Sequence, residues 1–599
     1  MALASFLIDA HNWPANPYPF KLTNLLLHLI NGALLAWLLL ILGRQCDFEE
    51  SHARWAAIFG AGLWLLHPLF VSTTLYIVQR EAMLPATFVL LGLTGYIRGR
   101  DRLLDGHVKR GATIAAISIG LATVLAVLSK ANGALLPLLA FTLEATVLKK
   151  PSAHAKWALN WLRGVVLVLP TCMLLGYLVH VTPWDLGTIP TERPWSYGQR
   201  LLTEPRVLLD YLRLLWLPHP YTSGLFNDQI AASTDIFHPW TTLPALLAVI
   251  LLPLAALAWR RRFPLIAAAI LFYFAGQLLE SSVIALELYY EHRNYLPALL
   301  MFWPLAALFV APGKRLRPRV IAVIAVVLML AGMTHLRSTV WGNGTEQALL
   351  WAALNPNSDR AAADASQFEM HLGRAAEAEQ RLRRIIPEHP DDPQLTMNLV
   401  SARCMQGSID ATDLALAAHS LQTTRKGTGL LFKWFRKAVN LAKSGSCAGF
   451  NFHSLRTLID AAWKNPGIAS VAGHRQDLFN IQGRLALAQG DVPMALYDFN
   501  AALHAEVRPE AALEQAAILG SAGFPCAGLA HLELFSSLRG KRARPRFGMA
   551  RIHEWLLQRQ GYWPHEIDHI RAQLLHDAKQ KMPQGCPAEL GSRDVKTLQ

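Results

Sequence analysis

Charged residues are scarce in this chain: only 16% of its 599 residues are Asp, Glu, Lys or Arg, whereas 53% are hydrophobic. This composition excludes an intrinsically disordered chain, which combines low hydrophobicity with high net charge. The mean hydropathy of +0.26 is also too high for an ordinary soluble enzyme. The length is about four times that of a typical domain and predicts several domains.

Several chemical signatures are missing as well. The sequence has no Walker A loop, HExxH motif, GxSxG motif or dinucleotide-binding fingerprint. An ATP-driven pump or a membrane hydrolase of those types is therefore unsupported. The six cysteines show no metal-like spacing. Cys404 and Cys447 can form a disulfide if the second half of the chain lies in an oxidising compartment, and free buried thiols are the alternative.

The hydrophobic residues are unevenly distributed. Long apolar stretches separated by short basic breaks run from Lys21 to Arg337, and a polar, Ala- and Leu-rich helical sequence follows. Since a spanning helix needs roughly 20 apolar residues, we predict an all-α protein with a polytopic membrane domain over 1–337 and a helical repeat domain over 338–599. About ten spanning helices are expected, near 22–43, 55–75, 82–97, 111–129, 132–148, 163–182, 242–259, 263–281, 295–312 and 319–336. His67-Pro68 predicts a bend in the second.

The formal charge of +14 raises the question of a nucleic-acid partner, but its distribution argues against one. Lys and Arg in short loops beside spanning helices mark the cytoplasmic side. The basic breaks are Arg98–Arg102, Lys109-Arg110, Lys149-Lys150, Arg260–Arg262 and Lys314–Arg319. With these breaks inside, the other loops and the C-terminal domain fall outside. No cationic signal region precedes Lys21, so we expect an upstream helix to be missing from this chain.

Spacings of 33 and 34 residues predict a helical repeat in the second half. The repeated positions are Asn355-Pro356 and His389-Pro390, Gly373 and Gly407, and Gly490 and Gly523. Ala378 and Ala495 each lie five residues after such a Gly, and residues 490–503 resemble the second helix of a tetratricopeptide repeat. A generic helical bundle is the alternative. Stacked helix pairs offer a concave surface to peptides or partner proteins. The basic stretch 539–546 is interpreted as a solvated or partner-facing patch.

Three groups of ionisable residues fall at the predicted outer membrane surface. They lie in His67-Pro68 with 76–81, in Ser129–Gly133 and in 287–297, and supply the cations Arg80, Lys130 and Arg293 and the carboxylates Glu81, Glu287 and Glu291. A single outer Lys or Arg commonly anchors a lipid headgroup. Three of them beside carboxylates and tyrosines favour a clamp for a lipid-borne phosphate. For Arg80, an ion pair with the adjacent Glu81 is the rival interpretation.

Residues 200–216 combine apolar positions at helical spacing with charged residues between them. This pattern predicts an amphipathic helix on the membrane. The helix either packs against neighbouring helices or forms the wall of a groove that admits a lipid tail. The polar and aromatic loop that follows, with His219-Pro-Tyr221 and Phe226-Asn-Asp228, is compatible with a sugar site.

These groups, in this order and followed by repeats, resemble membrane glycosyltransferases of the GT-C superfamily. The closest likeness is to bacterial relatives of the transmembrane-and-tetratricopeptide O-mannosyltransferases, including pilin-type enzymes. The matching stretches are Asn24–Asn31, His67-Pro68 with Ile77–Arg80, Ser129–Gly133 and Glu291–Pro297. The resemblance implies transfer of a sugar from a polyprenyl-phosphate carrier to a protein (pilin, for example) or a cell-surface glycan. It also implies an inner-membrane location with a periplasmic C-terminal domain.

By this resemblance, Arg80, Lys130 and Arg293 would bind the phosphate, and His67, Glu291 and Tyr295 would also contact substrate. A divalent metal is a further option for the leaving group. The family's acidic motif is not visible in this chain, so Asp9 and Glu81 are the nearest candidates for the base that activates the acceptor hydroxyl. Two alternatives remain open: a non-catalytic membrane scaffold that presents its repeats to an envelope assembly, and a transporter of lipid-linked glycans.

Overall fold

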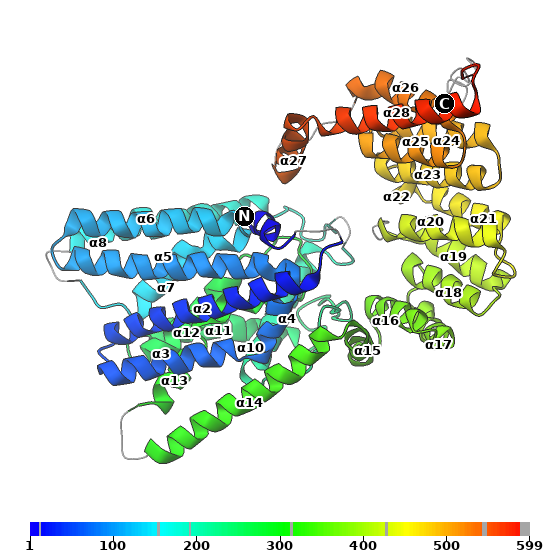
Figure 1. The fold of residues 1–599 in the computed structure, drawn as a ribbon. Coiled ribbons are helices and arrows are strands. Elements are labelled where there is room, and N and C mark those ends of the chain that lie inside the picture. Colours follow the sequence, from blue (N-terminus) through cyan, green and yellow to red (C-terminus); the bar gives the residue numbers. More distant parts are fainter. Residues whose placement is uncertain are drawn as a thin grey trace. The chain divides into compact units, whose positions relative to one another are not determined.

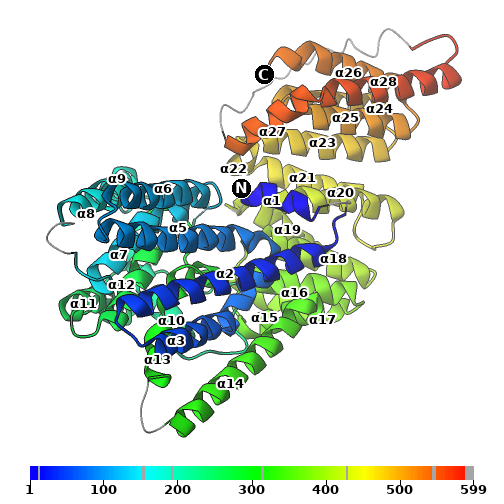
Figure 2. The same cartoon turned by 60° about the vertical axis from the view of Figure 1, so that its left-hand side comes forward.

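The computed structural model describes residues 1–10, 14–151, 156–190, 193–311, 316–425, 429–541 and 548–586. These residues form helices joined by loops, with one isolated β-bridge between Ser408 and Ala448. The all-α class is confirmed. The chain divides into two compact units, Met1–Asn355 (unit 1) and Pro356–Gln599 (unit 2), which are described separately (Figures 1 and 2).

Unit 1 combines long apolar helices with many short helical segments. In chain order they are α1 (Ala2–Ser5), η1 (Phe6–Ile8), α2 (Pro17–Gln45), α3 (Glu50–Leu65), η2 (Pro68–Phe70), α4 (Val71–Leu75), η3 (Ile77–Gln79), α5 (Arg80–Leu104), α6 (Val108–Val127), η4 (Ala131–Leu135), α7 (Leu136–Thr146), α8 (Lys156–Arg163), η5 (Gly164–Val168), α9 (Leu169–Val181), α10 (Tyr197–Trp216), α11 (Thr242–Trp259), α12 (Pro264–Gln277), η6 (Glu291–Asn294), η7 (Pro297–Leu300), α13 (Trp303–Phe309), α14 (Leu316–Gly342) and α15 (Gly344–Leu354).

Six helices among the described residues are long and apolar enough to cross a membrane, compared with about ten expected. They are Pro17–Gln45, Ile77–Leu104, Val108–Val127, Lys156–Val181, Thr242–Trp259 and Pro318–Gly342. A seventh is possible if α3 and the segment Pro68–Leu75 form one span, although they are bent by 51°. This bend lies at His67-Pro68, as predicted. The other three predicted spans correspond to the shorter helices α7, α12 and η7 with α13, each of which has Pro at its first or second position.

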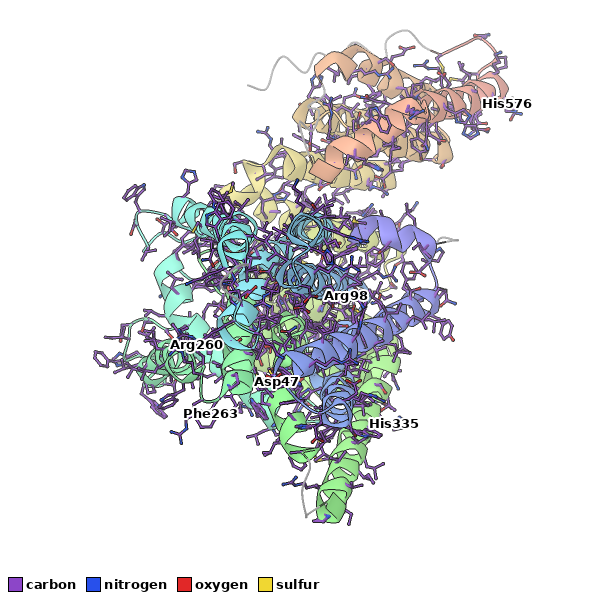
Figure 3. All side chains as sticks on the ribbon, turned by 90° about the vertical axis from the view of Figure 1, so that its left-hand side faces the viewer. Asp47, Arg98, Arg260, Phe263, His335 and His576 are labelled. Atoms are coloured by element: carbon purple, nitrogen blue, oxygen red, sulfur yellow. A yellow bond between two sulfur atoms is a disulfide. The ribbon has the colours of Figure 1, made fainter. Side chains whose placement is uncertain are left out.

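The basic breaks gather at one end of unit 1. Lys149 Nζ lies 2.5 Å from the Asp47 carboxylate, and Gln45 donates a hydrogen bond to Asp101. Figure 3 looks onto this end and labels Asp47, Arg98 and Arg260. The break at 314–315 lies outside the described residues. This grouping agrees with the prediction that the breaks share one side of the membrane, while the side itself stays a prediction.

The contact boundary between the units falls later in the chain than the predicted division at 337/338. The reason is that α14 continues through Arg337 to Gly342, and α15 packs Trp351 edge-on against Trp341 at 5.5 Å. The loop before α11 also packs on Trp351, because Gly224 lies directly against the ring of this tryptophan. These contacts bind the segment after Arg337 to unit 1.

Unit 2 is built from successive short helices. They are α16 (Asp359–His371), α17 (Ala375–Ile385), η8 (Ile386–Glu388), α18 (Pro393–Met405), α19 (Ala411–Thr423), α20 (Gly429–Ser444), α21 (Phe452–Trp463), α22 (Pro466–Ala469), α23 (Ala472–Ala488), α24 (Val492–Ala505), α25 (Pro509–Ser521), α26 (Pro525–Leu538), η9 (Arg539–Lys541), α27 (Gly548–Arg559) and α28 (Tyr562–Lys581).

The glycines of the predicted repeat end the first helix of a pair. Gly490 follows α23 with φ +83°, a left-handed conformation in which other residues are strained. Gly373, Gly407 and Gly523 have the same conformation after α16, α18 and α25. Ala495 is fully buried, and Phe499 of α24 packs against Gly483 of α23. Each of these Gly residues therefore ends a helix, and Ala495 lies in the packed interior of unit 2. Membership of the tetratricopeptide family stays a prediction.

Two disulfides lie in unit 2. One joins Cys404 to Cys447, so these two cysteines form the disulfide that was predicted as one alternative, and they are not free buried thiols. The other joins Cys526 to Cys586 and was not predicted. Cys46 and Cys172, both in unit 1, are free.

Candidate functional site

Three of the four stretches that carried the family resemblance contact one another directly. Arg80 Nε donates to Asn24 Oδ1 at 2.7 Å, which joins the start of α5 to α2. Tyr295 Oη lies 2.9 Å from His28 Nδ1 and 3.2 Å from Asn31 Nδ2, so the segment after η6 also packs on α2. Residues far apart in the sequence therefore form one polar layer within unit 1.

Arg80 and Asp9 form a buried ion pair. Arg80 Nη2 lies 2.5 Å from Asp9 Oδ2, and the side chains are 1% and 5% exposed. The guanidinium also donates to the backbone carbonyls of Ser5 and Phe20, while Thr23 donates to the second Asp9 oxygen at 2.7 Å. The Arg80 guanidinium and the Asp9 carboxylate are therefore both paired with residues of unit 1. The expected alternative, an Arg80–Glu81 pair, is wrong, because the partner of Arg80 is Asp9.

Glu81 is the second carboxylate predicted as a base. It lies in the first turn of α5 and is partly exposed. Its carboxylate makes no ion pair or hydrogen bond with another residue that the structure describes. Of the two predicted bases, Glu81 is therefore the carboxylate with free acceptor capacity.

Lys130 and Arg293 meet at a carboxylate that sequence reasoning missed. Lys130 Nζ lies 2.5 Å from Glu280 Oε1, and Arg293 Nε lies 3.7 Å from Glu280 Oε2. Glu280 and Arg293 are 4% and 3% exposed, whereas the Lys130 side chain is 21% exposed. Lys130 is thus the member of this group that reaches solvent. Two of the three predicted phosphate ligands are brought together, while Arg80 belongs to the separate Asp9 group.

A second buried ion pair adjoins this group. Arg200 and Glu204 lie one turn apart on α10, with 2.8 Å between Nη2 and Oε1. Arg200 also donates to the backbone carbonyls of Glu280, Ser282 and Leu286, which fixes the segment that carries Glu280. We call Lys130, Arg200, Glu204, Glu280 and Arg293 the Glu280 cluster. It has three cations and two carboxylates, so it has an excess of one positive charge when all are ionised.

Burial shifts the pKa values of two members of the Glu280 cluster. Desolvation raises the pKa of Glu204, and the opposing effect of Arg200 and Arg293 does not cancel the shift. Burial disfavours the charge on Arg293, yet neighbouring Tyr211 and Glu280 hold its pKa above the usual value. Burial thus disfavours the charge on Glu204, while its neighbours favour the charge on Arg293. Both effects favour an anion beside Lys130 and Arg293.

Two buried acceptors at the Glu280 cluster lack a well-formed hydrogen bond from a described residue. They are Asn132 Oδ1, two residues after Lys130, and Gln277 Oε1, three residues before Glu280. Buried acceptors of this kind are normally satisfied by water or a ligand. The hydroxyl groups of a ligand are hydrogen-bond donors of the kind that these acceptors lack.

The remaining predicted substrate residues lie elsewhere. Glu291 forms an ion pair with Arg337 of α14, and Arg337 also donates to Thr222 at 2.7 Å. His67 Nε2 lies 3.0 Å from the carbonyl of Leu215, and its ring stacks on Phe302 at 5.2 Å. His67 and Tyr295 are buried and engaged in packing.

Three members of the Glu280 cluster, Arg200, Glu204 and Glu280, were not predicted as site residues, although the sequence contains weak signals for them. Arg200 and Glu204 have the i, i+4 spacing of a helical ion pair. Glu280 lies at the end of the predicted span 263–281, where an ionisable residue is costly and therefore informative. A metal centre has no comparable support: no group of three or more His, Cys, Asp or Glu in the described part of the chain is arranged to hold a metal ion.

Comparison with known proteins gives no match: no protein-family model, curated protein or solved structure is significantly similar to this chain.

Proposed function

We propose that this protein is a membrane glycosyltransferase that moves a sugar from a polyprenyl-phosphate carrier to a hydroxyl of a protein or a cell-surface glycan. The observation that supports the proposal most directly is the convergence of Lys130 and Arg293 on Glu280. Cations held close together attract a phosphate, and Lys130 is accessible from solvent. The excess of positive charge in the Glu280 cluster acts in the same direction.

In this reaction the acceptor oxygen attacks the anomeric carbon, and the bond between that carbon and the phosphate oxygen breaks. The proton of the acceptor hydroxyl passes to a carboxylate, for which we propose Glu81 because Asp9 is already paired. The polyprenyl phosphate leaves with its electron pair, and Lys130 and Arg293 stabilise its increased negative charge. In this proposal Arg80 has a structural role, since its contacts with Ser5 and Asp9 fix the N-terminal segment.

For unit 2 we propose a tetratricopeptide-like repeat on the extracytoplasmic side, where it would receive the acceptor. Disulfides persist in oxidising compartments and are rare in the cytosol. Four of the six cysteines are paired, and all four lie in unit 2. This supports a periplasmic location and, with the basic breaks, an inner membrane.

The test compares the glycosylation of envelope proteins and glycans in cells with and without this gene by mass spectrometry. Cells that express the wild-type chain should show hexose or pentose increments that are absent without it. Lys130→Ala should abolish these increments at an unchanged membrane level of the protein. Lys149→Ala is the matched control, because Lys149 also lies 2.5 Å from a carboxylate but sits among the basic breaks.

Three results would contradict the proposal in different ways. If no increment depends on the gene, sugar transfer is wrong and the scaffold alternative gains. If Lys130→Ala retains the increments, the Glu280 cluster is not the phosphate site. If the purified protein moves a lipid-linked glycan across a liposome membrane without any acceptor, it is a transporter.

A further inference from the structure

Helix α27 in unit 2 exposes an apolar stripe. Ile552, Trp555 and Leu556 are 50%, 51% and 43% exposed, and their i, i+3, i+4 spacing places them on one face of the helix. In Figure 1, α27 lies at the start of α28, outside the stack of helix pairs. Large apolar side chains grouped in this way mark an interaction surface.

The stripe is not the face that packs on the rest of unit 2. Glu554, Leu557 and Gln558 face the other way and line a cavity of about 130 Å³, which they share with Phe535 and Trp563. Glu554 is 7% exposed and accepts a hydrogen bond from Gln558. The helix therefore has an inner side that is already used and an outer side that is free among the described residues.

Cations border the exposed stripe. Arg551 precedes Ile552, and Arg559 lies with its guanidinium carbon 5.4 Å from the centre of the Trp555 ring. From Arg539 through Tyr562, with both ends included, the sequence has seven Lys or Arg residues and a single acidic residue, Glu554. The stretch 542–547 lies outside the described residues and contributes here only its charge.

We infer that α27 binds the surface of a membrane that contains anionic phospholipids. A helix with Trp and aliphatic residues on one face and Arg at its borders lies in the membrane interface and is attracted to anionic lipids. Unit 2 is covalently joined to a unit with six candidate spans, and such a tether raises the effective concentration, so a weak surface affinity suffices. This inference depends on the membrane anchor and not on sugar transfer.

The experiment measures hydrogen–deuterium exchange of the full-length chain in two kinds of nanodisc. One contains phosphatidylcholine only, and the other contains phosphatidylcholine with phosphatidylglycerol. Amides of an exposed helix exchange through local opening, and binding of the closed helix suppresses that opening. Peptides covering 548–559 should exchange more slowly with phosphatidylglycerol. Since each cation near an anionic surface strengthens binding about fivefold, the Arg551→Gln/Arg559→Gln variant should lose up to about 25-fold of the slowing.

The double variant Lys437→Gln/Arg456→Gln is the control, because it removes two cations on other helices of unit 2 and should keep the slowing. Peptides from α23 to α26 report whether each variant is folded. Trp555→Ser tests the apolar contribution independently and should also reduce the slowing. Equal exchange of α27 in both nanodiscs would overturn the inference. So would a slowing that the Arg551→Gln/Arg559→Gln variant retains, or one that requires an added envelope protein instead of phosphatidylglycerol.

Discussion

Arg80 and Asp9 are separated by 71 positions in the chain, yet the guanidinium of one donates to the carboxylate of the other at 2.5 Å, and both side chains are buried. The ring of Phe6 lies 4.8 Å from the same guanidinium. Arg80 thereby holds α1 and η1 against the start of α5. A residue expected to bind substrate is thus part of the framework of unit 1.

The first prediction concerns the stability that this pair provides. Arg80→Ala leaves the Asp9 carboxylate buried without its cation, and breaking a buried pair in this way costs about 3–5 kcal/mol. We expect a large loss of thermal stability in detergent and a lower membrane level. Arg44→Ala removes an ion pair whose side chains are 53% and 44% exposed, so its cost should stay below about 1 kcal/mol.

Thermal unfolding of the purified variants, monitored by tryptophan fluorescence, measures both effects. If Arg80→Ala is as stable as the wild type and only sugar transfer is lost, Arg80 contacts substrate and the framework role is wrong.

The second prediction concerns Glu280. Glu280→Gln removes the carboxylate that Lys130 and Arg293 share, so the Glu280 cluster becomes more positive. The variant should bind a polyprenyl phosphate more tightly and lose affinity more steeply as salt is added. It should also be less stable by about 1–3 kcal/mol, because buried Arg293 loses a partner. Binding and unfolding measurements on the same preparation check both changes.

Glu287→Gln is the matched control for Glu280→Gln. Glu287 pairs with Arg193 but is 39% exposed, so neither lipid binding nor stability should change appreciably. A Glu280→Gln variant that binds polyprenyl phosphate as the wild type does, yet transfers no sugar, would show instead that Glu280 takes part in the chemistry.

The helical class, the bend at His67-Pro68 and α10 could be predicted because they depend on local patterns of apolar residues and Pro. The partner of Arg80 could not. Glu81 is adjacent in the sequence, but neighbouring residues on a helix do not face each other, and Asp9 becomes available only through tertiary packing. Glu280 was missed for the same reason, since its contact with Lys130 joins the segment after α12 to the residue before η4.

The number of spans was overestimated because a hydropathy window counts apolar residues and ignores helix continuity. Between 132 and 148 the sequence is apolar, but the helix α7 begins only at Leu136, after the short 3₁₀ helix η4 (Ala131–Leu135). The Cys526–Cys586 pair was not predicted because spacing alone does not determine which cysteines meet.

The third prediction follows from the pairing of the cysteines. Alkylation of the unreduced, denatured protein should label only Cys46 and Cys172, and peptide mapping should recover the Cys404–Cys447 and Cys526–Cys586 crosslinks. Replacing either pair by serines should lower the stability of unit 2 by about 2–4 kcal/mol, since each bond closes a long loop. The variant Cys46→Ser/Cys172→Ser should leave the stability of unit 2 unchanged. Labelling of all six thiols in protein isolated without reductant would refute both crosslinks and weaken the periplasmic assignment.

The fourth prediction concerns Asp498 in α24, which is 7% exposed. Burial raises its pKa from 3.8 to about 7, an effect that Arg456 opposes and Asp491 reinforces. In the unfolded chain the carboxyl loses its proton near pH 4, whereas in the folded chain it keeps the proton until about pH 7. The free energy of unfolding should therefore fall as the pH rises through this window, by about 4 kcal/mol at most, and change no further above it.

Asp498→Asn removes this dependence because the amide does not ionise. The variant should match the wild type near pH 4 and be more stable than it at pH 8, by up to a few kcal/mol. Urea unfolding of the full-length chain, followed by pulse proteolysis of unit 2 at both pH values, measures the difference. Asp460→Asn, at an exposed position on α21, is the control and should leave the pH profile as it is. If Asp498→Asn destabilises unit 2 equally at pH 4 and pH 8, the side chain acts through packing, and the proton retained by the folded protein is carried elsewhere.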